Sequence, residues 1–210
     1  DNLGTVTILG NASGKAQSIT GDIGSSASSD IKVLNIGESG ASTNYSKTTI
    51  NGDVFANSTV LNNGTTNSSE LILASGKNIT STITTADNGK GILTLFGGTQ
   101  TVTGQVGTNA NKLAEVNAGV NGATSTFAGD VYATNLDVEG TGTVNLGGDF
   151  TGTALRYNDN GIVNLADGKN INSSITSDAP NQGTLNLVGT STVTGQVGDA
   201  TNNLKEINAN

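Results

Sequence analysis

The sequence predicts an all-β protein, specifically a right-handed parallel β-helix (β-solenoid) with short irregular loops. Apolar clusters recur roughly every ten residues and alternate with Thr, Asn or Ser, which is the period-two pattern of β-strands. Apolar residues make up 33% of the sequence and aromatic residues 3%, so a sandwich would lack large inward side chains. The sequence also repeats itself internally, as solenoids do. Together these observations favour a narrow, stacked β-helix over a sandwich or barrel.

Taken in order along the sequence, the apolar clusters mark the expected strands. They run Val6/Ile8, Ile19/Ile23, Val33/Ile36, Ile50/Val54, Leu71/Leu73 and Ile79/Ile83, and continue in the same way to Leu204/Ile207. Gly, Asn and Asp separate them, and five Asn-Gly pairs are turn signals, beginning at Asn51, Asn63, Asn88, Asn121 and Asn160. No apolar stripe of period 3.6 is sustained, so we expect no long helices. With two or three strands a turn, we expect about 7 to 10 turns.

The sequence also contains a longer repeat, each copy of which spans several of the expected strands. Gly76–Thr84 matches Gly168–Thr176, and the heptapeptide TVTGQVG occurs at Thr101–Gly107 and again at Thr192–Gly198. A more diverged copy opens the sequence. We therefore expect one solenoid domain over 1–210, with repeats of roughly 85–92 residues at about 1–89 and 90–181 and a truncated copy at 182–210. Because the sequence begins at Asp1 and its last copy stops short, we expect it to be a segment of a longer protein.

TVTGQVG is one form of a pattern, apolar–x–Gly–Asp/Gln–apolar, that occurs six times. The copies are Ile19–Ile23, Ile50–Val54, Val102–Val106, Phe127–Val131, Leu146–Phe150 and Val193–Val197. Its Asp residues could be read as catalytic or Ca²⁺-binding, but Asp and Gln interchange between copies, so no required charge resides there. We interpret the pattern as structural: the apolar residues point inward, and Gly leaves a gap that a larger neighbour from the next turn can fill, or lets the backbone bend. Asp or Gln then points outward or lies at a corner.

The composition excludes several classes of function. The net charge of −8 argues against nucleic acid or an anionic membrane as partner. The sequence has no Cys and no His, and Arg156 is its one arginine. We therefore predict no catalytic, cofactor-binding or metal-binding residue, no cofactor, no membrane insertion and no enzymatic activity. Tyr45, Tyr132 and Tyr157 are possible contacts to sugars or a receptor.

The strings Gly183–Gly189, Ser191–Gly198 and Leu204–Asn208 resemble the passenger regions of rickettsial surface cell antigens of the outer membrane protein B type. The resemblance covers the whole sequence through its Gly/Asn/Thr-rich repeats and rests on no catalytic motif. It implies an autotransporter passenger at the bacterial cell surface, outside the outer membrane. It further implies roles in adhesion to host cells, in their invasion and in a surface layer. The implied partner is a host cell-surface protein.

Binding by such rods usually rests on loops that leave the repeat. The least repeat-like stretches are Glu38–Lys47 and Asn57–Ser69. Within them the sequence offers Tyr45, Lys47, Asn62 and Asn63 as candidate receptor contacts.

Two alternatives to an adhesin stay open. The protein could be a purely structural stalk or a lattice subunit that self-associates into a surface layer. It could also be a β-helix polysaccharide lyase or hydrolase, which needs a cleft lined by Lys, Arg, aromatic residues and paired carboxylates.

Overall fold

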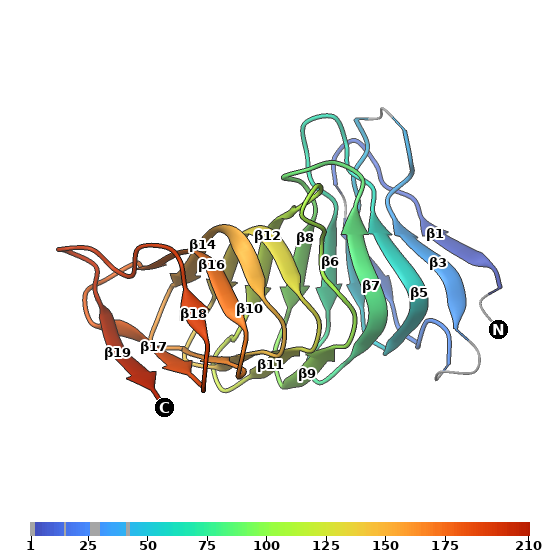
Figure 1. Ribbon diagram of the computed structural model, residues 1–210. Coiled ribbons are helices and arrows are strands. Elements are labelled where there is room, and N and C mark those ends of the chain that lie inside the picture. The colour runs from blue at the N-terminus through green and yellow to red at the C-terminus, as the bar shows by residue number, and fades with distance from the viewer. Residues whose placement is uncertain (1–2, 15, 26–29, 41–42) are drawn as a thin grey trace.

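The computed structural model describes residues 3–14, 16–25, 30–40 and 43–210, and their regular secondary structure is entirely β-strand (Figure 1). The strands are β1 (Thr5–Ile8), β2 (Ala16–Ile19), β3 (Ile31–Ile36), β4 (Lys47–Ile50), β5 (Val54–Leu61), β6 (Glu70–Leu73), β7 (Ile79–Thr85), β8 (Ile92–Leu95), β9 (Thr99–Val102), β10 (Leu113–Ala118), β11 (Thr124–Phe127), β12 (Val131–Val138), β13 (Thr143–Leu146), β14 (Phe150–Tyr157), β15 (Ile162–Leu165), β16 (Asn170–Ser177), β17 (Gln182–Leu187), β18 (Thr192–Val193) and β19 (Leu204–Ala209). Odd-numbered strands follow one another in one sheet and even-numbered strands in another, and the strand pairs are parallel. The predicted parallel β-solenoid is confirmed, with about 8 turns.

The register of the strands shows that the backbone winds around three faces. The first face is the column Leu34, Thr59, Ile83, Val106, Val131, Phe150, Ile171 and Val193. The second face is the column Thr48, Leu71, Leu93, Val116, Leu136, Leu155, Ile175 and Val197. The third face is the column Ile23, Val54, Ile79, Val102, Phe127, Leu146, Leu165 and Leu187. Long strands such as β5 and β14 cross a corner and belong to two faces, so three faces are built from two continuous ladders.

The core is the narrow space between the three faces. Buried and half-buried residues alternate along the strands, as in Thr143–Leu146 and Ile162–Leu165, so every second residue points inward. Val, Ile and Leu fill most inward positions, and burying each such residue stabilises the fold by about 1.5–3 kcal/mol. Small hydroxyl residues fill others, and the Thr59 and Ser81 hydroxyls lie 2.9 Å apart in a hydrogen bond inside the rod.

Tyr157 lies in this core, although the sequence offered it as a surface contact. A Cβ on Gly183, one turn later, would stand only 2.4 Å from the Tyr157 ring. Glycine at position 183 therefore leaves room for the ring. The phenol donates a hydrogen bond to the Thr184 carbonyl at 3.0 Å. Burial raises the pKa of the Tyr157 phenol far above its ordinary value of 10.0. The residue is therefore a core side chain whose one polar atom is satisfied.

Glycine in the repeated pattern allows the backbones of successive turns to approach at a corner. A Cβ on Gly52 would stand 2.3 Å from the Gly21 carbonyl carbon, and one on Gly148 would stand 2.5 Å from that of Gly129. Neither Gly52 nor Gly148 has a positive φ, so close approach and not backbone conformation requires glycine here. The sequence predicted a gap filled by a larger neighbour, whereas the neighbour is the backbone of the adjoining turn.

Aspartate in the same pattern accepts a hydrogen bond from the backbone of the next turn. The Asp22 carboxylate accepts from the Asp53 N–H at 2.8 Å, and the Asp53 carboxylate accepts from the Asn78 N–H at 2.7 Å. Asp130 and Asp149 form an equivalent pair at 2.9 Å at another corner. A corner amide that the strand ladder does not pair is thus satisfied. Asparagine serves equally, because the Asn78 Oδ1 accepts from the Thr101 N–H at 2.9 Å.

Glutamine in the pattern acts differently. The Gln105 Nε2 group donates to the Gly107 carbonyl at 2.8 Å, and the Gln196 Nε2 group donates to the Gly198 carbonyl at 2.7 Å. Asp and Gln therefore interchange because each satisfies one backbone group near the corner.

Outside the third face, a ladder of asparagine amides runs along the rod. The Nδ2 groups of Asn164, Asn186 and Asn208 each donate to the Oδ1 of the asparagine one turn earlier, at 2.8, 2.7 and 2.9 Å. The first acceptor in this series is Asn145, which itself donates to Thr126 at 3.3 Å. The ladder links five turns on one side of the rod.

Successive copies of the long repeat lie on different faces. The heptapeptide at Thr101–Gly107 passes from the third face to the first, because Val102 and Val106 belong to those columns. Its copy at Thr192–Gly198 passes from the first face to the second. Each copy therefore sits one face further on, and its outward residues point about a third of a turn away from those of the previous copy.

The two ends of the rod expose sheet edges and apolar residues. Leu3, Val6 and Leu9 are exposed beside β1, and Val188 and Ile207 are exposed near β19. Figure 1 places the two termini at opposite ends of the stack. Such edges can pair with another β-strand.

Candidate functional site

The most elaborate surface lies where the first face meets the second in the N-terminal half. There the backbone leaves the strands in loops that include 37–40 and 43–46, 62–69, and 86–91, and Figure 1 shows such loops rising beyond the sheets. A further loop at this corner covers 107–112, and the three turns that follow cross the corner without a loop because β12, β14 and β16 run straight through it. We call the first three loops, those of 37–40 with 43–46, 62–69 and 86–91, together the corner loops. They contain part of both loop segments that the sequence predicted. The prediction was wrong over 57–61, which belong to β5, and at Lys47, which begins β4. Residues 41 and 42 lie outside the described residues.

The corner loops enclose a cleft of about 370 Å³. Six of its nine lining residues have polar side chains, among them two acidic residues, one lysine and two asparagines. The lining residues are Glu38, Gly40, Asn62, Asn63, Gly64, Thr65, Ala86, Asp87 and Lys90. Each loop contributes to it, so the cleft exists because three successive turns stack.

Asn62 and Asn63, two of the predicted receptor contacts, form the floor of this cleft and do not protrude. Asn62 is 5% exposed and Asn63 is 6% exposed. The Asn63 amide donates to the Leu61 carbonyl at 3.2 Å and to the Thr85 hydroxyl at 2.9 Å, and its oxygen accepts from the Ser69 N–H at 2.9 Å. Asn62 donates to the Gly37 carbonyl at 3.2 Å. Buried polar groups must be paired, and these pairs hold the loop bases in place.

Lys90 links the corner loop 86–91 to the corner loop 62–69 by hydrogen bonds. Its ammonium group donates to the carbonyls of Gly64 and Thr65 at 2.8 and 2.7 Å. Charge-assisted bonds of this kind are stronger than neutral ones, so this contact orders the rim of the cleft. Lys90 was not among the residues that the sequence singled out. The sequence feature that could have indicated this contact is the spacing of Asn63-Gly64 and Asn88-Gly89, two β-turn motifs separated by about one turn of the solenoid.

Tyr45 and Lys47, the other predicted contacts, lie near the base of the first corner loop. The Tyr45 backbone exchanges hydrogen bonds with Asn11, and its ring lies against Gly14, where a Cβ would be 2.1 Å from the ring. Tyr45 is half-buried. Lys47 is exposed and pairs with Glu70 one turn later at 2.9 Å. The structure therefore gathers all four predicted residues around one corner, with Lys47 as the exposed member.

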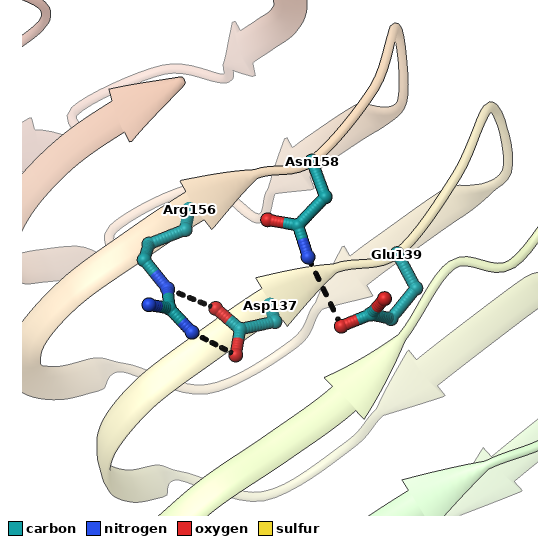
Figure 2. A network of polar contacts seen from close by, with 4 residues as sticks. All are labelled: Asp137, Glu139, Arg156 and Asn158. Carbon is teal, nitrogen blue, oxygen red and sulfur yellow. Dashed lines mark hydrogen bonds and ion pairs between the residues drawn. The ribbon is translucent and has the colours of Figure 1, made fainter. Parts of the chain in front are cut away.

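A second polar cluster lies on the second face, away from the corner loops (Figure 2). The Arg156 guanidinium donates two parallel bonds to the Asp137 carboxylate, at 2.5 and 2.6 Å. Asn158 donates to Glu139 beside it at 3.1 Å. The Asp137 side chain is 1% exposed, and its hydrogen bond raises the pKa of the Arg156 guanidinium. The pair bridges neighbouring turns, and because the nearly buried Asp137 carboxylate is held by two bonds from Arg156, the pair fits a structural role.

Within the described residues, no group of three or more acidic residues lies close enough together to hold a metal ion. The part of the protein that the structure describes contains no helix long and apolar enough to cross a membrane.

No protein-family model, curated protein or solved structure matched this sequence in comparisons with known proteins. The interpretation of the site therefore rests on its own geometry.

Proposed function

We propose that this protein is part of a rod displayed at a bacterial cell surface, an autotransporter-type passenger that adheres to a host cell-surface protein and assists invasion. The observation that carries the proposal is the concentration of the corner loops and their cleft on one edge of an otherwise regular solenoid. Loops held on a rigid scaffold are where binding residues usually occur. The resemblance of the repeats to rickettsial surface cell antigens supports the same role.

The composition is consistent with this role. A Cys-free protein needs no disulfide to fold outside the cell, and a solenoid can fold turn by turn after export because each turn contacts only its neighbours. The net charge of −8 favours a partner with a basic surface. The proposed rod has no catalytic role.

The experiment is a cell-binding titration with the purified protein and two charge-matched variants. Lys47→Ala with Asp87→Ala alters two exposed residues at the corner loops, whereas Lys205→Ala with Glu206→Ala alters two exposed residues near the far end. We expect saturable binding that the first variant weakens and the second leaves unchanged. Equal binding by all three proteins would show that the corner loops are not the contact, and absence of saturable binding would contradict adhesion.

A structural role is the second candidate, and one observation favours it for the C-terminal half. There β12, β14 and β16 cross the loop-bearing corner without interruption, and the asparagine ladder continues to Asn208. Such a segment is suited to a stalk or a surface-layer subunit. Concentration-dependent assembly into sheets, seen by electron microscopy, would support the lattice. Monomeric behaviour at high concentration would leave a stalk.

A further inference from the structure

The five Asn-Gly pairs are chemically reactive as well as turn-forming. In an Asn-Gly sequence the glycine backbone nitrogen can attack the amide carbon (Cγ) of the asparagine. A new bond forms between these two atoms, the bond from Cγ to Nδ2 breaks, and ammonia leaves, which gives a five-membered succinimide. Water then opens the ring at one of its two carbonyls and yields aspartate or isoaspartate, so atoms balance without an oxidant or cofactor. Glycine favours the attack because it has no Cβ and is conformationally free.

The fold restrains four of these five asparagines. The Asn51 amide donates to the Ser18 hydroxyl at 2.8 Å. Asn63 is buried and uses both its Nδ2 and its Oδ1 in hydrogen bonds, as described above. The Asn88 oxygen accepts from the Lys112 N–H at 3.0 Å. The Asn121 oxygen accepts from the Thr141 N–H at 2.9 Å. In each case the bond restrains the rotation that brings the asparagine Cγ to the glycine nitrogen.

Asn160 is different. It is exposed in the turn between β14 and β15, and its amide group makes no hydrogen bond to any described residue. Its own backbone N–H donates to the Asp159 carboxylate at 2.7 Å, which leaves the amide group outside that contact. The following Gly161 N–H, the attacking group, is likewise not hydrogen-bonded within the described residues. Both reacting groups at this pair are therefore uncommitted.

The packing around Gly161 acts in the opposite direction. A Cβ there would stand 2.4 Å from the nearest Val138 methyl group, so the glycine is held closely against the previous turn. Around Gly122, which follows Asn121, no atom lies within 4 Å of such a Cβ. The two pairs therefore distinguish the effect of hydrogen bonding from the effect of packing. Asn121 is hydrogen-bonded and its glycine is unpacked, whereas the Asn160 amide has no hydrogen bond to a described residue and its glycine is packed.

From this comparison we propose that Asn160 is a self-modification site, the first Asn-Gly pair of the folded protein to become aspartate or isoaspartate. Its product adds a negative charge next to Asp159 on the turn between the second and third faces. This proposal is independent of adhesion.

The test incubates the folded protein at mildly alkaline pH and follows each Asn-Gly peptide by mass spectrometry, with synthetic peptides to identify isoaspartate. We expect Asn160 to convert about fivefold faster than Asn121 or Asn88, the factor that corresponds to one hydrogen bond of about 1 kcal/mol. The same protein in denaturant should convert all five pairs at similar rates, and Asn160→Gln should remove the fast event alone. Faster conversion at Asn121, or no conversion at Asn160 in the folded protein, would overturn the assignment.

Discussion

The corner aspartates give the sharpest test of how this rod is held together, and Asp149 is the most informative of them. Its carboxylate accepts from the Asn170 N–H at 2.8 Å, while its own N–H donates to Asp130 at 2.9 Å. Asp149→Ala removes the acceptor and leaves the half-buried Asn170 amide without a partner. Asp149→Asn keeps an acceptor of the same shape, as Asn78 does at its corner.

The expected cost of Asp149→Ala follows from that geometry. An unsatisfied, partly buried amide costs about 1–3 kcal/mol, so we expect the free energy of unfolding to fall by about 2 kcal/mol. For Asp149→Asn the loss should stay below about 1 kcal/mol, because a neutral acceptor replaces a charged one. Urea unfolding followed by circular dichroism measures both. Asp178→Ala, at an exposed carboxylate, is the control and should stay within about 0.5 kcal/mol of the parent. If Asp149→Asn were as damaging as Asp149→Ala, the charge itself would matter and the reasoning would be refuted.

Three other contacts lead to expected outcomes of the same kind. Gly148→Ala should destabilise the rod by about 2–3 kcal/mol in urea unfolding because its Cβ would meet Gly129, whereas Gly21→Ala, with nothing within 4 Å, should be near neutral; equal effects would contradict the close-approach argument. Arg156→Ala should cost about 2–3 kcal/mol because it leaves the Asp137 carboxylate without its partner, and adding Asp137→Asn should recover part of the loss; no recovery would mean that the pair is not the cause. Because burial raises the pKa of Tyr157, its phenol stabilises the fold fully below the unfolded value of 10.0, and that contribution is lost as pH rises above it. Unfolding free energies measured against pH should therefore fall less steeply above about pH 10 in Tyr157→Phe than in the parent, and parallel curves would exclude this linkage.

The sequence was sufficient for features that depend on local pattern. Alternation of apolar and polar residues predicted the strands, and the interchange of Asp and Gln predicted that the motif is structural. The low content of aromatic residues predicted a narrow interior, which the observed core of Val, Ile and Leu matches.

Features that depend on register between distant residues could not be predicted from the sequence. Asn62 and Asn63 stand in a polar stretch that indicates an exposed loop, but partners such as Gly37 and Thr85 on adjoining turns bury them. Tyr157 points inward because Gly183, one turn later, makes room. The advance of the repeat by one face depends on how many strand segments each copy contains, which the sequence spacing alone does not reveal.

The in-register stacking of successive turns is the central claim, and spin-label distances along one face test it most directly. Thr101, Thr126, Asn145, Asn164, Asn186 and Asn208 are in register on successive turns. With no native Cys, labels can be placed at Thr101 with Asn186 and at Thr101 with Asn208. At about 4.8 Å a turn, we predict separations near about 19 Å and about 24 Å. Two distances that fail to increase by about one turn spacing would contradict the solenoid register.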